Sequence, residues 1–173
     1  ILTKGVYRLE DLNGSGTIDS SAEVTAFFIP PALGGSPFHW DIGQDALGNF
    51  YLNDTGNDVV WRFADADGSG IVDASEATVV YTAPGSSLIW EVTPAPDGSL
   101  YVAEDQNPDR LLRLVDGDGD GVFDAVTEVQ TVYDETVAAI NFGSPKGVAL
   151  VTDELPIGSS RCGPAIANST GAA

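Results

Sequence analysis

An internal repeat restricts the fold of this chain more than any other feature of its sequence. One block of the repeat is marked by an arginine that recurs after 54 and then 51 residues, as Arg8, Arg62 and Arg113. Another block contains a tryptophan, a glycine and a tyrosine that recur 50 residues later, as Trp40, Gly48, Tyr51 and Trp90, Gly98, Tyr101. Similarity at a fixed period of this length is typical of proteins built from one repeated supersecondary unit.

Each complete repeat is predicted to contain four short strands, because runs of β-branched and aromatic residues alternate with turn-forming residues. The strands are predicted at 38–42, 50–53, 59–63 and 78–82, and again at 88–93, 100–103, 111–115 and 129–133. A half repeat beginning with a third strand at 5–10 precedes them, and 146–152 is predicted to start another. The predicted fold class is therefore all-β, with four-stranded blades of β-propeller type, about three blades and an incomplete ring.

The segment FYLNDTGNDVVWR, residues 50–62, resembles the blade motif of NHL-type propellers. In that family a strand, a short Asp-x-Gly-Asn turn and a second strand ending in arginine recur in every blade. Residues 100–114 form a looser copy, so the resemblance covers two full blades and the second half of an earlier one. It implies propeller architecture and leaves the function open, because propellers have many functions.

The domain organisation follows from the repeats. Residues 1–155 are predicted to contain the blades, and the Gly/Ser/Pro/Ala-rich residues 156–173 a linker or the start of another module. The chain contains no methionine, so we expect a processed chain or a fragment of a longer one. The single cysteine, Cys162, excludes an internal disulfide and a paired-cysteine zinc motif.

The acidic loop between the third and fourth strands carries the most specific motif. Its second copy, residues 65–76, has the twelve-position pattern of an EF-hand calcium loop. The predicted ligands are Asp65, Asp67, Ser69, the backbone carbonyl of Ile71, Asp73 and Glu76. Gly70 at position six allows the sharp turn because it has no Cβ.

The other two copies share this pattern. The third predicts Asp116, Asp118, Asp120, the carbonyl of Val122 and Asp124, and the first predicts Asp11, Asn13, Ser15, the carbonyl of Thr17 and Asp19. Their closing glutamates, Glu128 and Glu23, come one residue later than Glu76 does in its loop. A one-residue bulge would bring them to the same metal, so up to three Ca²⁺ are predicted, one in each loop.

These residues suit Ca²⁺ because it is a hard ion that takes six to eight oxygen ligands. Without the ion, the crowded carboxylates are expected to repel one another and shift their pKa values. The number of carboxylates rises from three in the first loop to four and then five, and we expect the affinity to rise in that order. Strands flank the loops, so the helix opening of calcium sensors has no counterpart, and the calcium is expected to be structural.

The charge of the chain limits its partners and its location. Seven Lys and Arg against 26 Asp and Glu give a formal charge of −19, which argues against nucleic acid and anionic membranes as partners. No apolar run is long enough for membrane insertion as a helix. Calcium loops of low affinity are typical of extracellular modules, so a secreted or cell-surface location in a bacterium is predicted.

Two functions are consistent with the sequence. The first is a calcium-stabilised extracellular propeller module with a structural, adhesion or assembly role, which is similar to calcium-binding repeat propellers of secreted, planctomycete-like bacterial proteins. The alternative is a fragment of a propeller enzyme, a quinone-dependent sugar dehydrogenase or a lactonase, because planctomycete-like proteins resembling that dehydrogenase group carry similar Arg-Leu-x-Asp-x-x-Gly-x-Gly loops. His39, the only histidine, is the candidate general base for the alternative. The absence of a convincing catalytic cluster favours the first function, and no catalytic or cofactor-binding residue is assigned.

The open ends of the repeat array predict an assembly. An incomplete ring leaves an unpaired strand edge and apolar faces, which favour association with another chain. We therefore expect an oligomer or filament, formed with other copies of this chain or with the missing part of a larger chain. The recurring arginines are expected to pack between blades or to pair with a neighbouring acid.

Overall fold

The computed structural model describes residues 4–105, 107–137 and 147–150, together with the backbone of 164–166. These residues form antiparallel β-sheets and two short 3-10 turns, η1 (Ser21–Glu23) and η2 (Ala74–Glu76), and they contain no α-helix. The predicted all-β class is confirmed. No helix in this part of the chain is long and apolar enough to cross a membrane.

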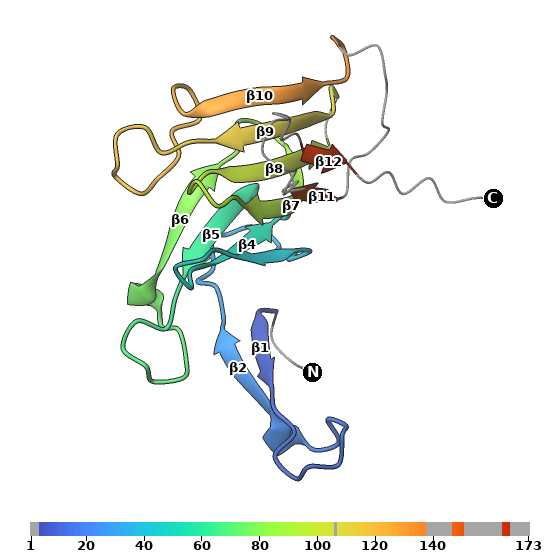
Figure 1. Cartoon of the computed structure of the whole chain (residues 1–173), viewed down its shortest axis with the longest axis vertical. Coiled ribbons are helices and arrows are strands. Elements are labelled where there is room, and N and C mark those ends of the chain that lie inside the picture. The colour runs from blue at the N-terminus through green and yellow to red at the C-terminus, as the bar shows by residue number, and fades with distance from the viewer. Residues whose placement is uncertain (1–3, 106, 138–146, 151–163, 167–173) are drawn as a thin grey trace, which may run out of the picture.

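Two four-stranded sheets form the centre of the molecule (Figure 1), and in each the strands pair in sequence order. The first contains β3 (Ile42–Gln44), β4 (Phe50–Asp54), β5 (Val59–Phe63) and β6 (Ala77–Thr82). The second contains β7 (Leu88–Pro94), β8 (Leu100–Asp105), β9 (Arg110–Leu114) and β10 (Val129–Asp134). Two-stranded sheets are formed by β1 (Val6–Leu9) with β2 (Val24–Phe28), and by β11 (Val148–Leu150) with β12 (Pro164–Ile166).

The predicted four-stranded units are thus present, but the described residues form no closed ring. Consecutive units pack against one another, with β3 and β4 contacting β7, and β7 contacting β11. The ring closure that defines a propeller is therefore not seen in the part of the chain that the structure describes.

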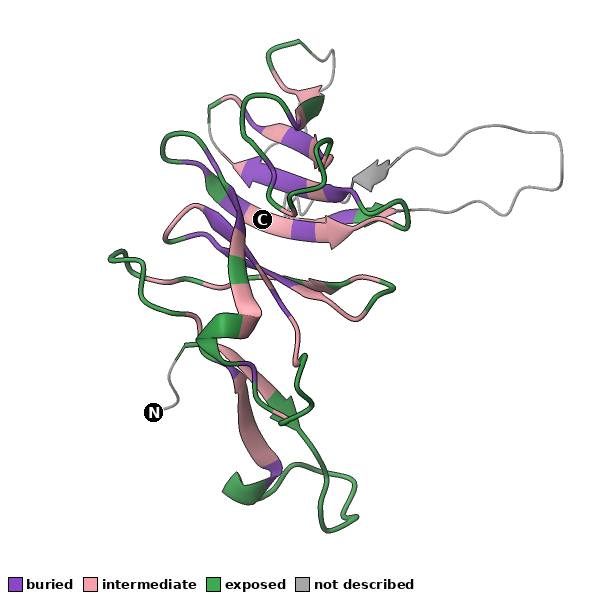
Figure 2. Cartoon of the chain, turned by 90° about the vertical axis from the view of Figure 1, so that its left-hand side faces the viewer, coloured by how far each residue is buried: buried purple, intermediate pink, exposed green. Residues whose placement is uncertain are grey.

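The apolar core lies within and between these sheets (Figure 2). One cluster joins the first sheet to the second and contains Tyr51, Val60, Val80, Tyr81, Ile89, Val92, Leu100, Val102, Leu112 and Leu114. A second cluster joins β2 to the first sheet and contains Phe28, Leu52, Val59, Trp61, Phe63 and Val72. Burial of these side chains is the main favourable term that holds successive units together.

The strand predicted at 38–42 is wrong in its position, because the first strand of that sheet is β3, Ile42–Gln44. The buried Asn53 explains the difference. Its Oδ1 accepts hydrogen bonds from the backbone amides of Trp40 (3.0 Å) and Asp41 (2.7 Å). A side chain therefore satisfies two amides that the prediction assigned to a strand, and the regular ladder begins only afterwards.

The C-terminal expectations are only partly within the described residues. Of the strand predicted at 146–152, Val148–Leu150 forms β11, Gly147 lies just before it outside the strand, and the rest lies outside the described residues. The tail 156–173 also lies outside them, apart from the backbone of Pro164–Ile166, which pairs with β11.

Candidate metal centres

The three acidic loops join β1 to β2, β5 to β6 and β9 to β10 (Figure 1), and are called here the first loop (11–23), the second loop (65–76) and the third loop (116–128). Their backbones follow the same course, because the glycines at positions four and six have positive φ in every loop. These φ values are 71° and 82° for Gly14 and Gly16, 71° and 87° for Gly68 and Gly70, and 79° and 82° for Gly119 and Gly121. Only glycine adopts this conformation without strain, which explains its place in each loop.

Backbone amides of each loop point inward at its carboxylates. The Oδ2 atom of the aspartate at position one accepts a hydrogen bond from the amide of the glycine at position six. The distances are 2.7 Å for Asp11–Gly16, 2.9 Å for Asp65–Gly70 and 3.0 Å for Asp116–Gly121. The equivalent bond in each copy shows that the loops share one turn, as their sequence pattern predicted.

The closing glutamates occupy equivalent places despite their different spacing. One oxygen of each accepts from the amide at position two and the other from the amide at position nine. These amides belong to Leu12 and Asp19 for Glu23, to Ala66 and Asp73 for Glu76, and to Gly117 and Asp124 for Glu128. The third loop accommodates its extra residue in a wider turn, in which the Glu128 amide donates to the Asp124 carbonyl. The predicted one-residue adjustment is therefore present, and direct metal binding by Glu23 and Glu128 stays a prediction.

Two loops bring carboxylates close enough to share a metal ion. Oxygens of Asp65, Asp67 and Glu76 lie within 4.8 Å of one another, and so do oxygens of Asp116, Asp118 and Asp120. The Oδ1 atom of Asp65 is buried and has no hydrogen-bond partner. Because a buried polar atom without a partner is costly, this oxygen is suited to bind a cation.

The second loop also offers a hydroxyl and a backbone carbonyl oxygen as candidate ligands. The Ser69 hydroxyl lies 2.9 Å from the carbonyl oxygen of Ile71, which brings the predicted ligands at positions five and seven together. The position-nine carboxylates are directed differently, because Oδ1 of Asp73 and of Asp124 accept from the amides of Ser75 and Val126 in the following turn.

The first loop differs at position three, where Asn13 replaces an aspartate. In this loop Ser15 and Thr17 make the same contact as Ser69 and Ile71, with the hydroxyl 3.0 Å from the carbonyl. Asn13 Nδ2 donates to Asp19 Oδ1 at 3.0 Å. Among the described residues this loop has no group of three converging carboxylates, and its place as the weakest of the three sites stays a prediction.

The loop amides also set the ionisation of the carboxylates. The Gly16 amide lowers the pKa of Asp11, and the Ser69 amide lowers the pKa of Asp67. The Asp19 amide likewise lowers the pKa of Glu23. Hydrogen bonding by the amides therefore outweighs the effect of burial at these groups, and at Asp67 also the repulsion by Asp73, so they are deprotonated at neutral pH, which is the form that binds metal.

His39 lies apart from the acidic loops. Its Nε2 atom is 3.7 Å from Oδ2 of the buried Asp54, and burial of the imidazole lowers the pKa of His39. In the described part of the chain, His39 belongs to no group of metal-type ligands. Asp54 is the last residue of β4, so His39 lies at the end of that strand.

The recurring arginines have two different environments. Arg113 forms an ion pair with Asp97 at 2.6 Å, as one of the two expectations stated. A Cβ atom placed on Gly70 would lie 3.6 Å from both terminal nitrogens of Arg8, and one placed on Gly121 would lie 3.1 and 3.2 Å from those of Arg62. Each of these arginines therefore packs on position six of the loop in the next repeat. This agrees with the expectation that the arginines pack between repeats. The glycine at position six was not predicted as their partner, although the shared period of arginine and loop was a signal for it.

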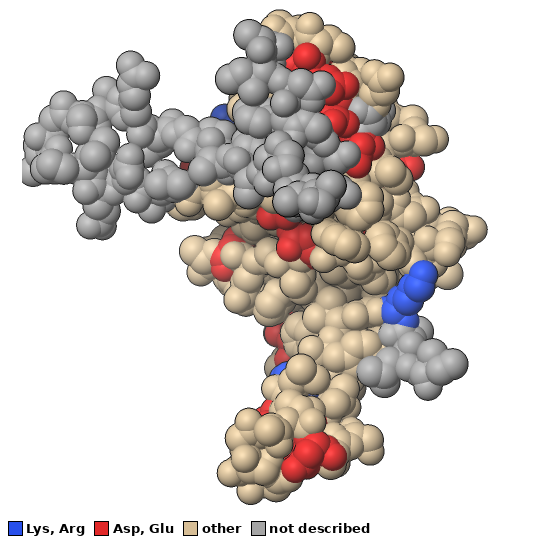
Figure 3. All heavy atoms as spheres, turned by 90° about the vertical axis from the view of Figure 1, so that its right-hand side faces the viewer, with Lys and Arg blue, Asp and Glu red and all other residues tan. Residues whose placement is uncertain are grey.

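Acidic side chains gather at several places on the face shown in Figure 3, including its lower end. Comparisons with models of protein families, with curated proteins and with solved structures found no match to this chain. The interpretation of the loops therefore depends on their own geometry.

Proposed function

We propose that this chain is a calcium-stabilised extracellular module of β-propeller type, with a structural, adhesion or assembly role. The observation that carries the proposal is the common geometry of the three acidic loops. Each loop has glycines with positive φ at positions four and six, and the amide of the second glycine donates a hydrogen bond to the aspartate at position one. In each loop the closing glutamate accepts backbone hydrogen bonds with both of its carboxylate oxygens. A chain of charge −19 that gathers carboxylates in this way gains stability from bound cations.

Calcium is the proposed ion because the loops offer oxygen donors only. The candidate ligands are carboxylates, hydroxyls, backbone carbonyls and one amide oxygen, with neither histidine nor cysteine among them. Zinc and copper favour nitrogen or sulfur ligands. Magnesium demands octahedral geometry and retains several waters, whereas calcium accepts six to eight oxygens from a flexible loop.

The proposed role of calcium is structural. Each loop connects two paired strands, so an ion there would fix the ends of one hairpin in place. An ion that binds only the folded chain stabilises it by mass action. Sites of this kind with low affinity suit the high calcium concentration outside cells, which supports the proposed secreted or cell-surface location.

The test is a calorimetric calcium titration of the full chain and of Asp65→Asn. The substitution removes the charge next to the buried, unpartnered oxygen and keeps the size of the side chain. We expect three ions for the wild type and two for the variant. The matched control is Asp97→Asn, which removes an aspartate outside the loops and should leave the number at three. No calcium binding, or an unchanged number in Asp65→Asn, would overturn the proposal.

A further inference from the structure

Successive repeats contact one another through the same backbone hydrogen bond. In each fourth strand one residue bulges out of the register: Phe27 in β2, Val80 in β6 and Val132 in β10. The carbonyl of Phe27 accepts from the amide of Val72, and that of Val80 from the amide of Phe123, both at 2.7 Å. Val72 and Phe123 each stand at position eight of the following loop, so the contact is part of the repeat.

Two further features accompany this bond at both places. The side chains at position eight are buried. The arginine of the preceding repeat packs on the glycine at position six, as described for Arg8 and Arg62. A bulged carbonyl, an apolar hollow and an arginine on one repeat therefore hold the loop of the next repeat. This arrangement is called here the loop contact.

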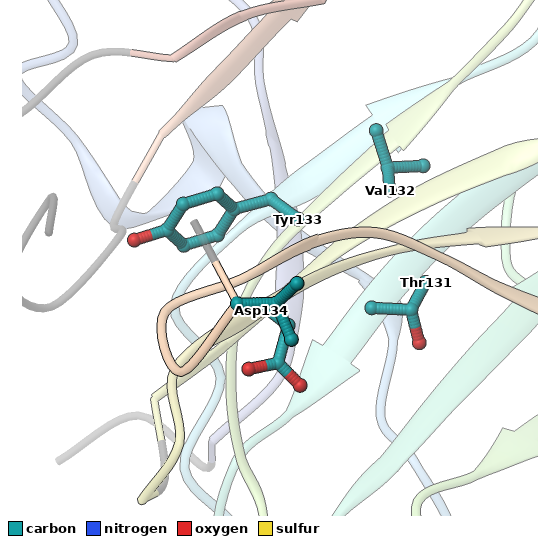
Figure 4. Close-up of a pocket in the computed structure, with 5 residues that line it drawn as sticks. Thr131, Val132, Tyr133 and Asp134 are labelled. Carbon is teal, nitrogen blue, oxygen red and sulfur yellow. The ribbon is translucent and has the colours of Figure 1, made fainter. Parts of the chain in front are cut away.

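The receiving half of the loop contact is present on β10, without a loop among the described residues. No described backbone amide from outside the sheet donates to the Val132 carbonyl, and Val132 is 44% exposed where the equivalent Val80 is 0% exposed. Beside it lies a hollow of about 440 Å³ (Figure 4), lined by Thr131, Val132, Tyr133, Asp134 and Val137. Arg113, the third recurring arginine, is on the neighbouring strand β9 and donates to Gln130 of β10.

The inserting half is present on the first loop. Ile18 stands at position eight and is 41% exposed, whereas the equivalent Val72 is 4% exposed. Among the described residues, no atom lies within 4 Å of a Cβ placed on Gly16 at position six, the place where Gly70 and Gly121 meet an arginine. The molecule thus exposes both halves of a contact that it forms twice internally.

We propose that β10 binds the first acidic loop of a second copy of this chain. The Ile18 amide of the second copy donates to the Val132 carbonyl, and its side chain fills the hollow beside Tyr133. Arg113 then lies against Gly16 and brings a positive charge to a loop that contains Asp11, Asp19 and Glu23. Because the two surfaces differ, the contact is head-to-tail and produces a closed ring or a filament. The inference rests on the proposed function in one respect, which is that the loop docks with its calcium bound.

Sedimentation velocity of the full chain over a range of concentrations, in calcium, tests the proposal. The variants are Ile18→Asp in the loop and Val132→Asp in the strand. The matched control is Leu47→Asp, at an 89% exposed site in the β3–β4 turn. The wild type and the control are expected to associate, and each of the two variants to bind itself at least tenfold more weakly. An equal mixture of Ile18→Asp and Val132→Asp retains one intact surface of each kind, and should form a one-to-one dimer.

Calcium titration of the same samples separates this inference from the proposed function. A wild type that binds calcium and stays at 18.0 kDa at every concentration would overturn the contact and leave the proposed function intact. Association that neither variant weakens would also overturn it. So would a monomeric wild type whose melting temperature falls in Val132→Asp, since a segment of the same chain would then cover β10. Association that both variants weaken, in a wild type that binds no calcium, would support the contact between β10 and the first loop, but would overturn docking with calcium bound and the proposed function.

Discussion

The aspartates of the acidic loops are held by backbone amides instead of basic side chains. The two ion pairs among the described residues join Arg110 to Glu104 and Arg113 to Asp97, and neither includes a loop carboxylate. Amides orient the oxygens without neutralising their charge. The loops therefore retain the negative charge that a divalent cation would compensate.

Acid should destabilise the calcium-free chain through these groups. The amides of Ser69 and Val126 lower the pKa of Asp67 and of Asp124 in the folded state. The stability they contribute is present above the unfolded pKa of about 4 and is lost as the pH falls through the lowered values. In chelator, the free energy of unfolding from urea titrations should therefore decrease below about pH 4, and less steeply in Asp67→Asn. An identical pH dependence in the variant would contradict this account.

At the scale of the element, each acidic hairpin is closed by one glutamate. Glu128 is nearly buried and accepts three backbone hydrogen bonds, from Gly117 (2.6 Å), Asp118 (3.2 Å) and Asp124 (2.8 Å). These bonds tie the beginning of the third loop to its end. The closing glutamate therefore has a structural role before any metal binds.

Glu128→Ala should destabilise the chain even in chelator, because three amides lose their acceptor. The three amides belong to exposed residues that water can reach, so the expected loss in the free energy of unfolding is about 1.5–3 kcal/mol, which is typical of one hydrogen bond to a charged group. Urea unfolding of this variant should be compared with Glu10→Ala, which removes an exposed glutamate outside the loops. Equal stability of the two variants would show that Glu128 does not close the hairpin.

The acidic loops were predictable because their ligands, turns and glycines lie within about a dozen residues of one another. Strands such as β5 were predictable for the same reason, since four of the five residues of Val59–Phe63 are β-branched or aromatic and the fifth is an arginine. The start of β3 was not, because Asn53 satisfies amides twelve and thirteen residues before it in the chain. The hydrogen bond from the Val72 amide to the Phe27 carbonyl was not predictable either, because it joins two repeats and depends on how their sheets pack.

At the scale of the whole molecule, calcium and repeat packing act on the same loops. The third loop contacts β6 through Phe123, and the second contacts β2 through Val72. An ion that fixes a loop therefore also fixes the surface that meets the previous repeat. We expect calcium to stabilise the array as a unit, and not one hairpin at a time.

Thermal unfolding with and without calcium tests this central claim most directly. At a calcium concentration of about 100 times Kd, each occupied site adds about 2.7 kcal/mol, and each kcal/mol raises the Tm by about 2–4 °C in a chain of this size. Calcium should thus raise the Tm of the wild type by about 5 °C or more over its value in chelator, in a single transition, and magnesium at equal ionic strength should raise it much less. The same Tm in chelator and in calcium would contradict a structural role for calcium in this protein.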